Sequence, residues 1–169
     1  MAAEAEILDE LHRLRARLPQ LTGALAASVD GLVLAQDTRG VEPEGVAALT
    51  AAALSISVRL ADATGQGDFR ELLVRGAHGY VASYAAGPSA VLTVLAEGQV
   101  NVGRLHLEGR RSSSRIGELV QAAIQLPEGA RRQPPAATDT GLPVRPSSPP
   151  AGGSPARSPR PATGEAATE

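Results

Sequence analysis

The stretch VAALTAAALSISV, residues 46–58, contains no charged side chain and limits how this sequence can fold. Pro43 and Glu44 stand just before it, and a proline at the first helical position followed by many alanine and leucine residues predicts a helix. Two apolar stripes recur along this helix at steps of three and four residues. The first comprises Val46, Leu49, Ala53, Ile56 and Leu60, and the second comprises Ala47, Ala51, Leu54, Val58 and Ala61.

A helix that is apolar on every side has no face suited to water, so each stripe needs a surface to pack against. One stripe can pack on a sheet formed by the same chain, although the sequence does not say which stripe it is. The remaining stripe, taken as the second, needs a surface outside the monomer, and the same helix of a second copy is the simplest choice. The helix therefore predicts that two chains associate.

The overall composition fits one folded domain with an appendage. The 169 residues carry a net charge of -2 and are 43% hydrophobic, which is enough for a real core. The lack of cysteine excludes disulfides and thiolate metal sites. Near-neutral charge and an aromatic content of 2% disfavour nucleic-acid binding, which needs a basic surface or stacking side chains. Charges are interspersed among the first apolar residues, so we expect a cytoplasmic protein without membrane insertion.

The composition changes after residue 126. Most of the 13 prolines lie in residues 127–169, mixed with serine, glycine, alanine and threonine. Such a segment has too few apolar side chains to offset the entropy lost on ordering. We therefore predict a folded domain over residues 1–126 and a disordered tail over residues 127–169.

Periodicity and turn signals predict the order of elements in the folded part. The expected helices cover residues 4–17, the apolar stretch and residues 101–124, and the expected strands cover residues 23–28, 32–35, 69–75, 79–85 and 90–96. Asp30 and Gly31 form a tight-turn signal between the first two strands. The last strand, AVLTVLA, is apolar on both faces and should be central. We expect an α+β fold in which a five-stranded antiparallel sheet has one helix on one face and two on the other.

The last predicted helix has small residues in its apolar stripe. Gly109 and Ser112 interrupt a face that otherwise carries larger apolar side chains such as Leu105 and Ile116. Asn101 is a good cap for the start of this helix. The two small residues should allow the helix to approach the surface beneath it closely.

This order of elements, and the residues that fill it, resemble the Roadblock family of dynein light chain and bacterial GTPase-regulator domains. The resemblance rests on LPQLTGALAASVDGLVLAQD (residues 18–37), GDFRELLVRGAHGYVASYAAGPSAVLTVLA (67–96) and NVGRLHLEGRRSSSRIGELV (101–120), together with the apolar helix. The hairpin GALAASVDGLVLA is the most specific piece. The resemblance covers residues 4–125, implies a Roadblock/profilin-like fold, and does not extend to the proline-rich tail.

The family resemblance also implies how the chain associates. Roadblock domains form homodimers whose sheets join edge to edge through the third strand, here residues 69–75, while the middle helices pack across the two-fold axis. The bacterial relatives are partners of small Ras-like GTPases. The residues that this places at the dimer interface are Val46, Leu49, Ala53, Leu54, Ile56, Phe69 and Leu73.

Exposed arginines are the candidate contacts for such a partner, because a GTPase regulator can insert an arginine into the partner's active site. The candidates are Arg59, Arg110, Arg111 and Arg115. The alternative is that these arginines only solvate an exposed helix face, and the bacterial relatives do not work through an arginine finger. We regard the solvated face as the simpler interpretation.

The sequence shows no catalytic or metal-binding constellation. His12, His78 and His106 lack ligand spacing, and the glycines of residues 65–67 lead into a strand, whereas phosphate loops lead into a helix. We therefore expect no cofactor, no metal and no enzymatic activity. The favoured function is a homodimer that binds a small Ras-like GTPase, either stimulating its GTP hydrolysis or holding it in a complex. The alternative is a dimeric adaptor that joins other proteins without a nucleotide-dependent partner.

Overall fold

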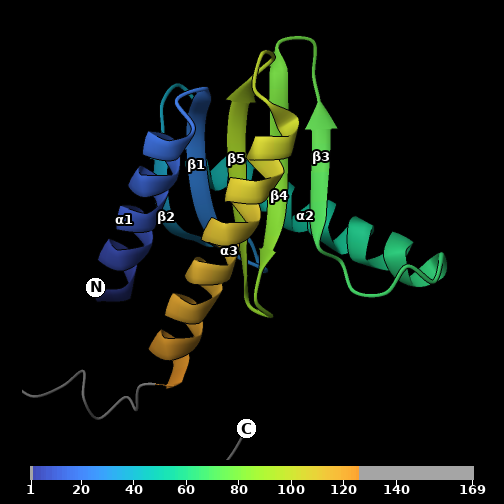
Figure 1. Cartoon of the computed structure of the whole chain (residues 1–169). Coiled ribbons are helices and arrows are strands. Elements are labelled where there is room, and N and C mark those ends of the chain that lie inside the picture. Colours follow the sequence, from blue (N-terminus) through green and yellow to red (C-terminus); the bar gives the residue numbers. More distant parts are fainter. Residues whose placement is uncertain (1, 126–169) are drawn as a thin grey trace, which may run out of the picture. The chain divides into compact units, whose positions relative to one another are not determined.

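The computed structural model describes residues 2–125. Its eight elements follow the predicted order of helices and strands (Figure 1). They are α1 (Ala2–Arg17), β1 (Leu21–Ser28), β2 (Val33–Thr38), α2 (Pro43–Ala63), β3 (Glu71–Arg75), β4 (Gly79–Ala86), β5 (Ala90–Glu97) and α3 (Val102–Gln125). The predicted tail, residues 127–169, lies outside the described residues.

The five strands form one antiparallel sheet in the order β2-β1-β5-β4-β3. The apolar strand β5 is central, as its pattern predicts, and β2 and β3 are the two edges. The second strand reaches Thr38, beyond the predicted end at residue 35, because Thr38 still pairs with Gly23 of β1. The third strand begins at Glu71, two residues later than predicted, after a loop in which Gly65 and Gly67 adopt positive φ.

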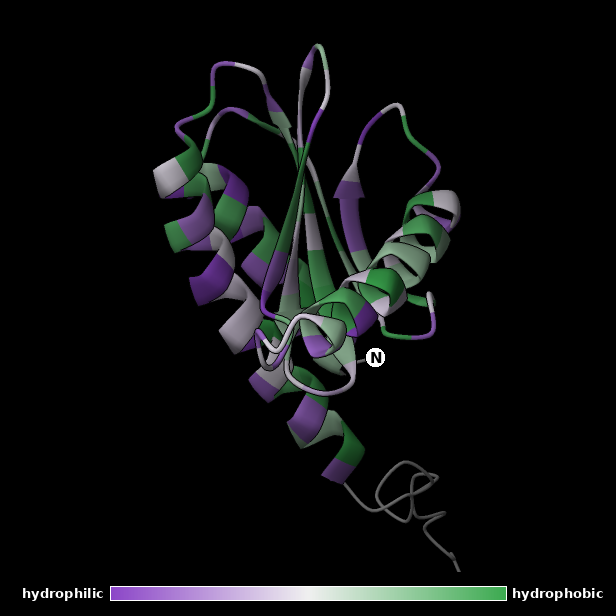
Figure 2. Ribbon diagram, turned by 90° about the vertical axis from the view of Figure 1, so that its right-hand side faces the viewer, coloured by the Kyte–Doolittle hydropathy of each residue, from purple (hydrophilic) through white to green (hydrophobic). Residues whose placement is uncertain are grey.

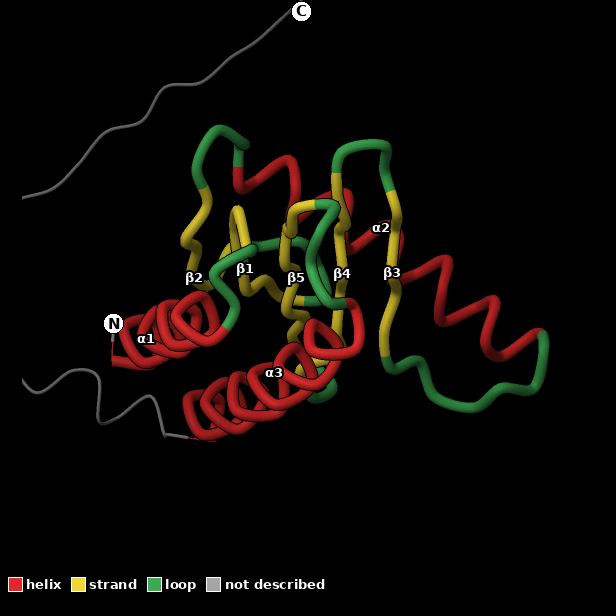
Figure 3. Tube along the Cα trace, turned by 45° about the horizontal axis from the view of Figure 1, so that its top comes forward, coloured by secondary structure: helices red, strands yellow, loops and turns green. Residues whose placement is uncertain are grey.

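The helices divide between the two faces of the sheet as predicted. Helices α1 and α3 lie side by side on one face, and α2 crosses the other face (Figure 3). The larger core lies beneath α1 and α3, where leucines of both helices meet alternate residues of the strands. Leu11, Leu14, Leu92 and Leu105 are fully buried there. The smaller core lies beneath α2 and is built around Leu25, Ala27, Ala47 and Val91.

The close approach predicted for α3 is present. A Cβ atom added at Gly109 would clash with the Tyr84 ring of β4, so only glycine fits without a shift. Ser112 is fully buried, and its hydroxyl donates to the Glu10 carboxylate of α1 at 2.7 Å. Asn101 caps the helix, since its side-chain oxygen accepts a hydrogen bond from the Arg104 N–H at 2.9 Å.

A polar network joins α1 to α3. Arg17 of α1 donates to Glu10 at 3.0 Å, to the Ser112 hydroxyl at 2.8 Å and to Glu108 at 2.7 Å. Glu10 is nearly buried, and these partners supply the hydrogen bonds that a buried carboxylate requires. The network fixes α1 and α3 relative to each other.

Candidate protein interface

The first part of α2 anchors the helix to the sheet. Ala47 is fully buried against β1 and β5, and Thr50 is nearly so. The Thr50 hydroxyl lies 3.1 Å from that of Thr93 in β5, which lies 3.1 Å from that of Ser83 in β4. This buried chain of three hydroxyl groups holds the helix in one rotation about its own axis.

This rotation decides which apolar stripe is left over. The stripe that begins at Ala47 faces the sheet, and the stripe that contains Leu49, Ile56 and Leu60 faces away from it. These three side chains are 73%, 68% and 63% exposed. The sequence left open which stripe faces the sheet. The burial of Ala47 and the exposure of Leu49 and Ile56 show that the first stripe, and not the second, is left without a surface.

The later part of α2 extends past the edge of the sheet. Figures 1 and 3 both show the helix running beyond β3, and Figure 2 shows that it is hydrophobic along most of its length. By length and composition alone this helix could also cross a membrane, and it is the one such helix within residues 2–125. The contacts of Ala47 and Thr50 instead lay it across the sheet.

Beside α2, the sheet itself presents uncovered apolar side chains. Val74 of β3 pairs with Val81 of β4, and the two are 50% and 37% exposed. They lie on the α2 face, since Ala82 and Tyr84 of β4 belong to the core on the other face. Both valines were absent from the predicted interface, although the alternation of side chains along β3 and β4 places them on this face. We define the apolar surface as the exposed side chains Leu49, Ile56 and Leu60 of α2 together with Val74 and Val81 of the sheet.

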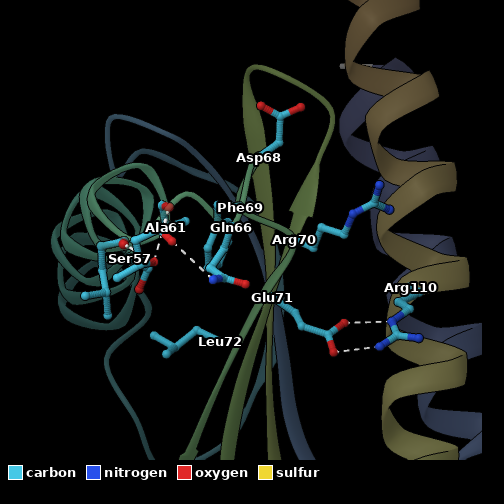
Figure 4. Close-up of a pocket in the computed structure, with 11 residues that line it drawn as sticks. Ser57, Ala61, Gln66, Asp68, Phe69, Arg70, Glu71, Leu72 and Arg110 are labelled. Atoms are coloured by element: carbon cyan, nitrogen blue, oxygen red, sulfur yellow. Dashed lines mark hydrogen bonds and ion pairs between the residues drawn. The ribbon is translucent and has the colours of Figure 1, made fainter.

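A hollow of about 700 Å³ separates the end of α2 from the sheet edge (Figure 4). Ser57, Leu60 and Ala61 of α2 form one side, and Glu71 and Leu72 of β3, together with Arg110 of α3, form the other. The loop that closes it contributes Thr64, Gln66, Asp68, Phe69 and Arg70. The lining mixes apolar and charged side chains without a converging set of hydrogen-bonding groups, which fits a surface for another protein better than a small-molecule pocket.

An ion-pair cluster lies at this edge of the sheet. Arg110 of α3 donates two hydrogen bonds to the Glu71 carboxylate of β3, both 2.7 Å long (Figure 4). His106 Nδ1 lies 3.3 Å from the same carboxylate and 3.2 Å from the Tyr84 hydroxyl. The Tyr84 hydroxyl also lies 3.3 Å from the Leu105 carbonyl oxygen, to which it donates. The cluster ties α3 to β3.

The cluster shifts the ionisation of its members. The hydrogen bonds from Arg110 lower the pKa of Glu71, against the opposing effect of burial, and the nearby His106 lowers it further. The same pairing raises the pKa of Arg110. Burial raises the pKa of the Tyr84 hydroxyl well above its ordinary value, so this group stays neutral. The cluster is thus a structural ion pair beside a neutral phenol.

The seven residues predicted for the dimer interface occupy three kinds of position. Leu49 and Ile56 belong to the apolar surface. Ala53, Leu54 and Phe69 are half-buried. Val46 packs against the smaller core and Leu73 against the larger one, on the opposite face of the sheet. Leu60, Val58, Val74 and Val81 are exposed and were absent from the predicted set.

The four predicted arginine contacts do not form one patch. Arg59 lies on α2, and the other three lie on α3 across the sheet. Arg110 is held by Glu71, and Arg115 is paired with Glu118 at 2.9 Å. Arg59 and Arg111 are exposed and make no ion pair with any residue in the 2–125 range. The structure therefore separates two paired arginines from two that are available to a partner.

The described residues hold no arrangement suited to a metal. Within residues 2–125 no group of three or more His, Asp or Glu side chains is placed to bind an ion. The loop that contains Gly65 and Gly67 leads into β3, so no helix N-terminus is available there to receive a phosphate.

A Roadblock/LC7 domain profile matches residues 7–96. A comparison with curated proteins finds no match. Among solved structures, "MglB with tetrameric arrangement" has a TM-score of 0.69 at 20% identity and covers 73% of this chain and 93% of that chain. The gliding protein MglB from Thermus thermophilus has a TM-score of 0.67 at 20% identity, covering 72% of this chain and 93% of that chain.

A Roadblock/LC7 domain from Streptomyces avermitilis has a TM-score of 0.59 at 24% identity and covers 69% of this chain and 96% of that chain. Identities at this level establish a shared fold and no more. The profile match spans more than half of the sequence, from α1 through the central strand β5. This chain therefore belongs to the Roadblock/LC7 domain family.

Proposed function

We propose that this protein is a homodimeric regulator or scaffold that binds a small Ras-like GTPase in the cytoplasm and has no enzymatic activity of its own. One observation carries the proposal: a Roadblock/LC7 domain presents Leu49, Ile56 and Leu60 on a helix that its own sheet leaves uncovered. Isolated exposed leucines are common, but a contiguous apolar helix face needs a protein partner.

A second copy is the simplest partner for this face. The apolar surface extends from α2 across Val74 and Val81 to the free edge of β3, so helix and strand can be covered together by one neighbour. A two-fold axis at the sheet edge brings the same surface of two chains into contact. Family membership supports this arrangement, since the Roadblock resemblance implies a homodimer joined at the third strand.

The GTPase partner follows from the family and from the exposed charge left on the dimer. The resemblance implies small Ras-like GTPases as partners, and solved structures of MglB are among the structures similar to this chain. Arg59 and Arg111 are the predicted arginines that remain without an ion pair in the described part of the chain. Charges of this kind at the rim of an interface act mainly on the association rate and its salt dependence.

The test uses the full chain and a small Ras-like GTPase from the same organism, loaded with GDP or with a non-hydrolysable GTP analogue. We expect the GTP form to bind more tightly, with an association rate that falls as salt rises. Arg111→Ala should slow association, and Arg115→Ala is the matched control because Arg115 is already paired with Glu118. Absence of binding in both nucleotide states would contradict the GTPase proposal.

Single-turnover GTP hydrolysis then separates the two modes of action. A regulator that orders the GTPase's own catalytic residues accelerates hydrolysis in the wild type and in Arg111→Ala once binding is saturated. A scaffold binds without acceleration. If Arg111→Ala abolished acceleration at saturation, an arginine finger would be the mechanism instead.

The second candidate function is a dimeric adaptor without a nucleotide-dependent partner. The extended hollow between α2 and the sheet edge favours it, because this hollow could receive a segment of any protein partner. Equal binding of the GDP and GTP forms, or a stable dimer that binds neither, is the result that this function predicts.

A further inference from the structure

The hydrogen bonds between β3 and β4 show which backbone groups of β3 point outward at its free edge. The Gly76 N–H donates to the Gly79 carbonyl oxygen at 2.8 Å. The Arg70 carbonyl oxygen accepts a hydrogen bond from the Ala85 N–H at 2.9 Å. Even-numbered residues of this strand therefore direct their backbone groups toward β4, and odd-numbered residues direct theirs outward. The outward-directed residues are Glu71, Leu73 and Arg75.

The side chains of β3 alternate between the faces with the same period. Leu73 packs on the core beneath α1 and α3, so Glu71 and Arg75 share that face, and Leu72 and Val74 share the α2 face. Glu71 confirms this placement through its bonds to Arg110 of α3. Arg75 confirms it through its guanidinium, which lies 5.8 Å from the centre of the Tyr80 ring.

Symmetry restricts how two such strands can pair. An antiparallel junction of two sheets about a two-fold axis keeps each face on its own side, so odd-numbered residues pair with odd-numbered ones. This rule and the outward direction of the odd-numbered backbone groups both hold only if the two-fold axis passes beside one residue, which then lies opposite its own copy. For most of the strand to be paired, this central residue must be Leu72, Leu73 or Val74.

The charges of the strand choose between these registers. With Leu73 at the centre, Glu71 lies opposite Arg75 of the second copy, twice by symmetry, and Leu72 lies opposite Val74. With Leu72 at the centre, Glu71 faces an apolar leucine and Arg75 faces Phe69, outside the strand. With Val74 at the centre, Glu71 faces Ala77, beyond the other end. Cross-strand pairs of opposite charge are favourable, so the sequence ELLVR is self-complementary in one register.

We propose that two copies of this chain pair through β3 about a two-fold axis at Leu73, with Glu71 of each copy bonded to Arg75 of the other. The inference rests on the homodimer proposed above and adds its register and its selective ion pair. Glu71 then lies between Arg110 of its own chain and Arg75 of the second copy. Both Glu71 oxygens already accept one hydrogen bond from Arg110, and the remaining lone pairs of the carboxylate can accept from Arg75. The pair selects another copy of this chain over a domain whose third strand lacks these charges.

Cysteine substitution reads the register directly, because the chain contains no cysteine of its own. In the proposed register Leu73 lies opposite itself, with Cα atoms about 5.5 Å apart, within reach of a disulfide. Leu72 and Val74 lie more than about 7 Å from their own counterparts and directly opposite each other. Under oxidation, Leu73→Cys should form a linked dimer, while Leu72→Cys and Val74→Cys should link only when the two variants are mixed.

Charge reversal tests the ion pair. Glu71→Arg alone places two arginines at each junction pair, and Arg75→Glu alone places two glutamates there, so each variant should dimerise roughly tenfold more weakly. An equimolar mixture restores both pairs of opposite charge and should form the heterodimer in preference to either homodimer. Glu71→Arg also removes the partner of Arg110 within its own chain. This loss is the same in the Glu71→Arg homodimer and in the heterodimer, so it does not affect the preference for the heterodimer.

The outcomes separate the register from the dimer itself. Sedimentation of the wild type at micromolar concentration as a monomer would overturn both. A dimer in which Leu72→Cys or Val74→Cys links on its own, or in which mixing gives no heterodimer preference, would overturn the register and leave the homodimer standing.

Discussion

Gly109 of α3 lies directly against the ring of Tyr84 in β4, with no room for a side chain between them. The contact sets the distance between the last helix and the sheet, and it places the Tyr84 hydroxyl within 3.2 Å of His106. Helix interiors normally disfavour glycine, so this glycine is explained by packing and not by helix propensity.

Gly109→Ala should destabilise the domain by about 1 to 3 kcal/mol, because the added methyl group overpacks against a buried ring. Gly103→Ala is the matched control on the same helix, since a Cβ there meets only the Asn101 side-chain oxygen at 3.4 Å. The control should be neutral or up to about 1 kcal/mol more stable. Urea unfolding of the two variants measures the difference, and equal effects would contradict the packing explanation.

Ile56→Glu should abolish dimer formation while leaving the fold of each chain intact. Ile56 is 68% exposed in the single chain, so a glutamate there stays in water until a second copy approaches. Ala47→Glu should instead unfold the domain, because Ala47 is fully buried against the sheet. Sedimentation and circular dichroism distinguish the two. A dimeric Ile56→Glu protein would show that the association uses another surface.

Glu71 should stabilise the fold only above moderately acidic pH. Its folded-state pKa lies below the ordinary value of 4.5, because it accepts hydrogen bonds from Arg110. A carboxyl group with a lowered pKa contributes stability that is fully present above its unfolded pKa and is lost as the pH falls through the folded value. The free-energy gap between wild type and Glu71→Gln should therefore shrink as the pH falls below about pH 4.5.

Glu118→Gln is the control for this titration, because it also removes one negative charge from an ion pair. Glu118 pairs with Arg115 within α3, and this pair does not reach the sheet. Urea unfolding over the pH series gives the comparison. A gap for Glu71→Gln that widened toward low pH would reverse the sign of this prediction and exclude Arg110 as its cause.

Removal of residues 127–169 should leave the thermal unfolding of the domain almost unchanged. The segment has too few apolar side chains to form a core of its own, so we expect a chain that ends at Leu126 to melt within about a degree or two of the full chain. Differential scanning calorimetry makes the measurement. A drop of about ten degrees would mean that the tail packs on the domain, since a shift of this size corresponds to more than about 1 kcal/mol.

The sequence determined the order of elements in this protein. Local patterns sufficed for this: the uncharged run of α2, the turn at Asp30 and Gly31, and the doubly apolar strand that became β5. Each of these signals depends on residues close together in the chain, and each position was confirmed within a few residues. The small side chains of Gly109 and Ser112 predicted a close helix contact for the same reason.

Tertiary structure alone decided which surface is left for a partner. Both stripes of α2 are apolar by sequence, and the contacts of Ala47 and Thr50 with distant strands fixed the helix rotation that exposes Leu49 and Ile56. The pairing of Arg110 with Glu71, 39 residues away, removed one candidate arginine and left Arg111 available. These outcomes depend on contacts between segments far apart in the chain, which no local periodicity encodes.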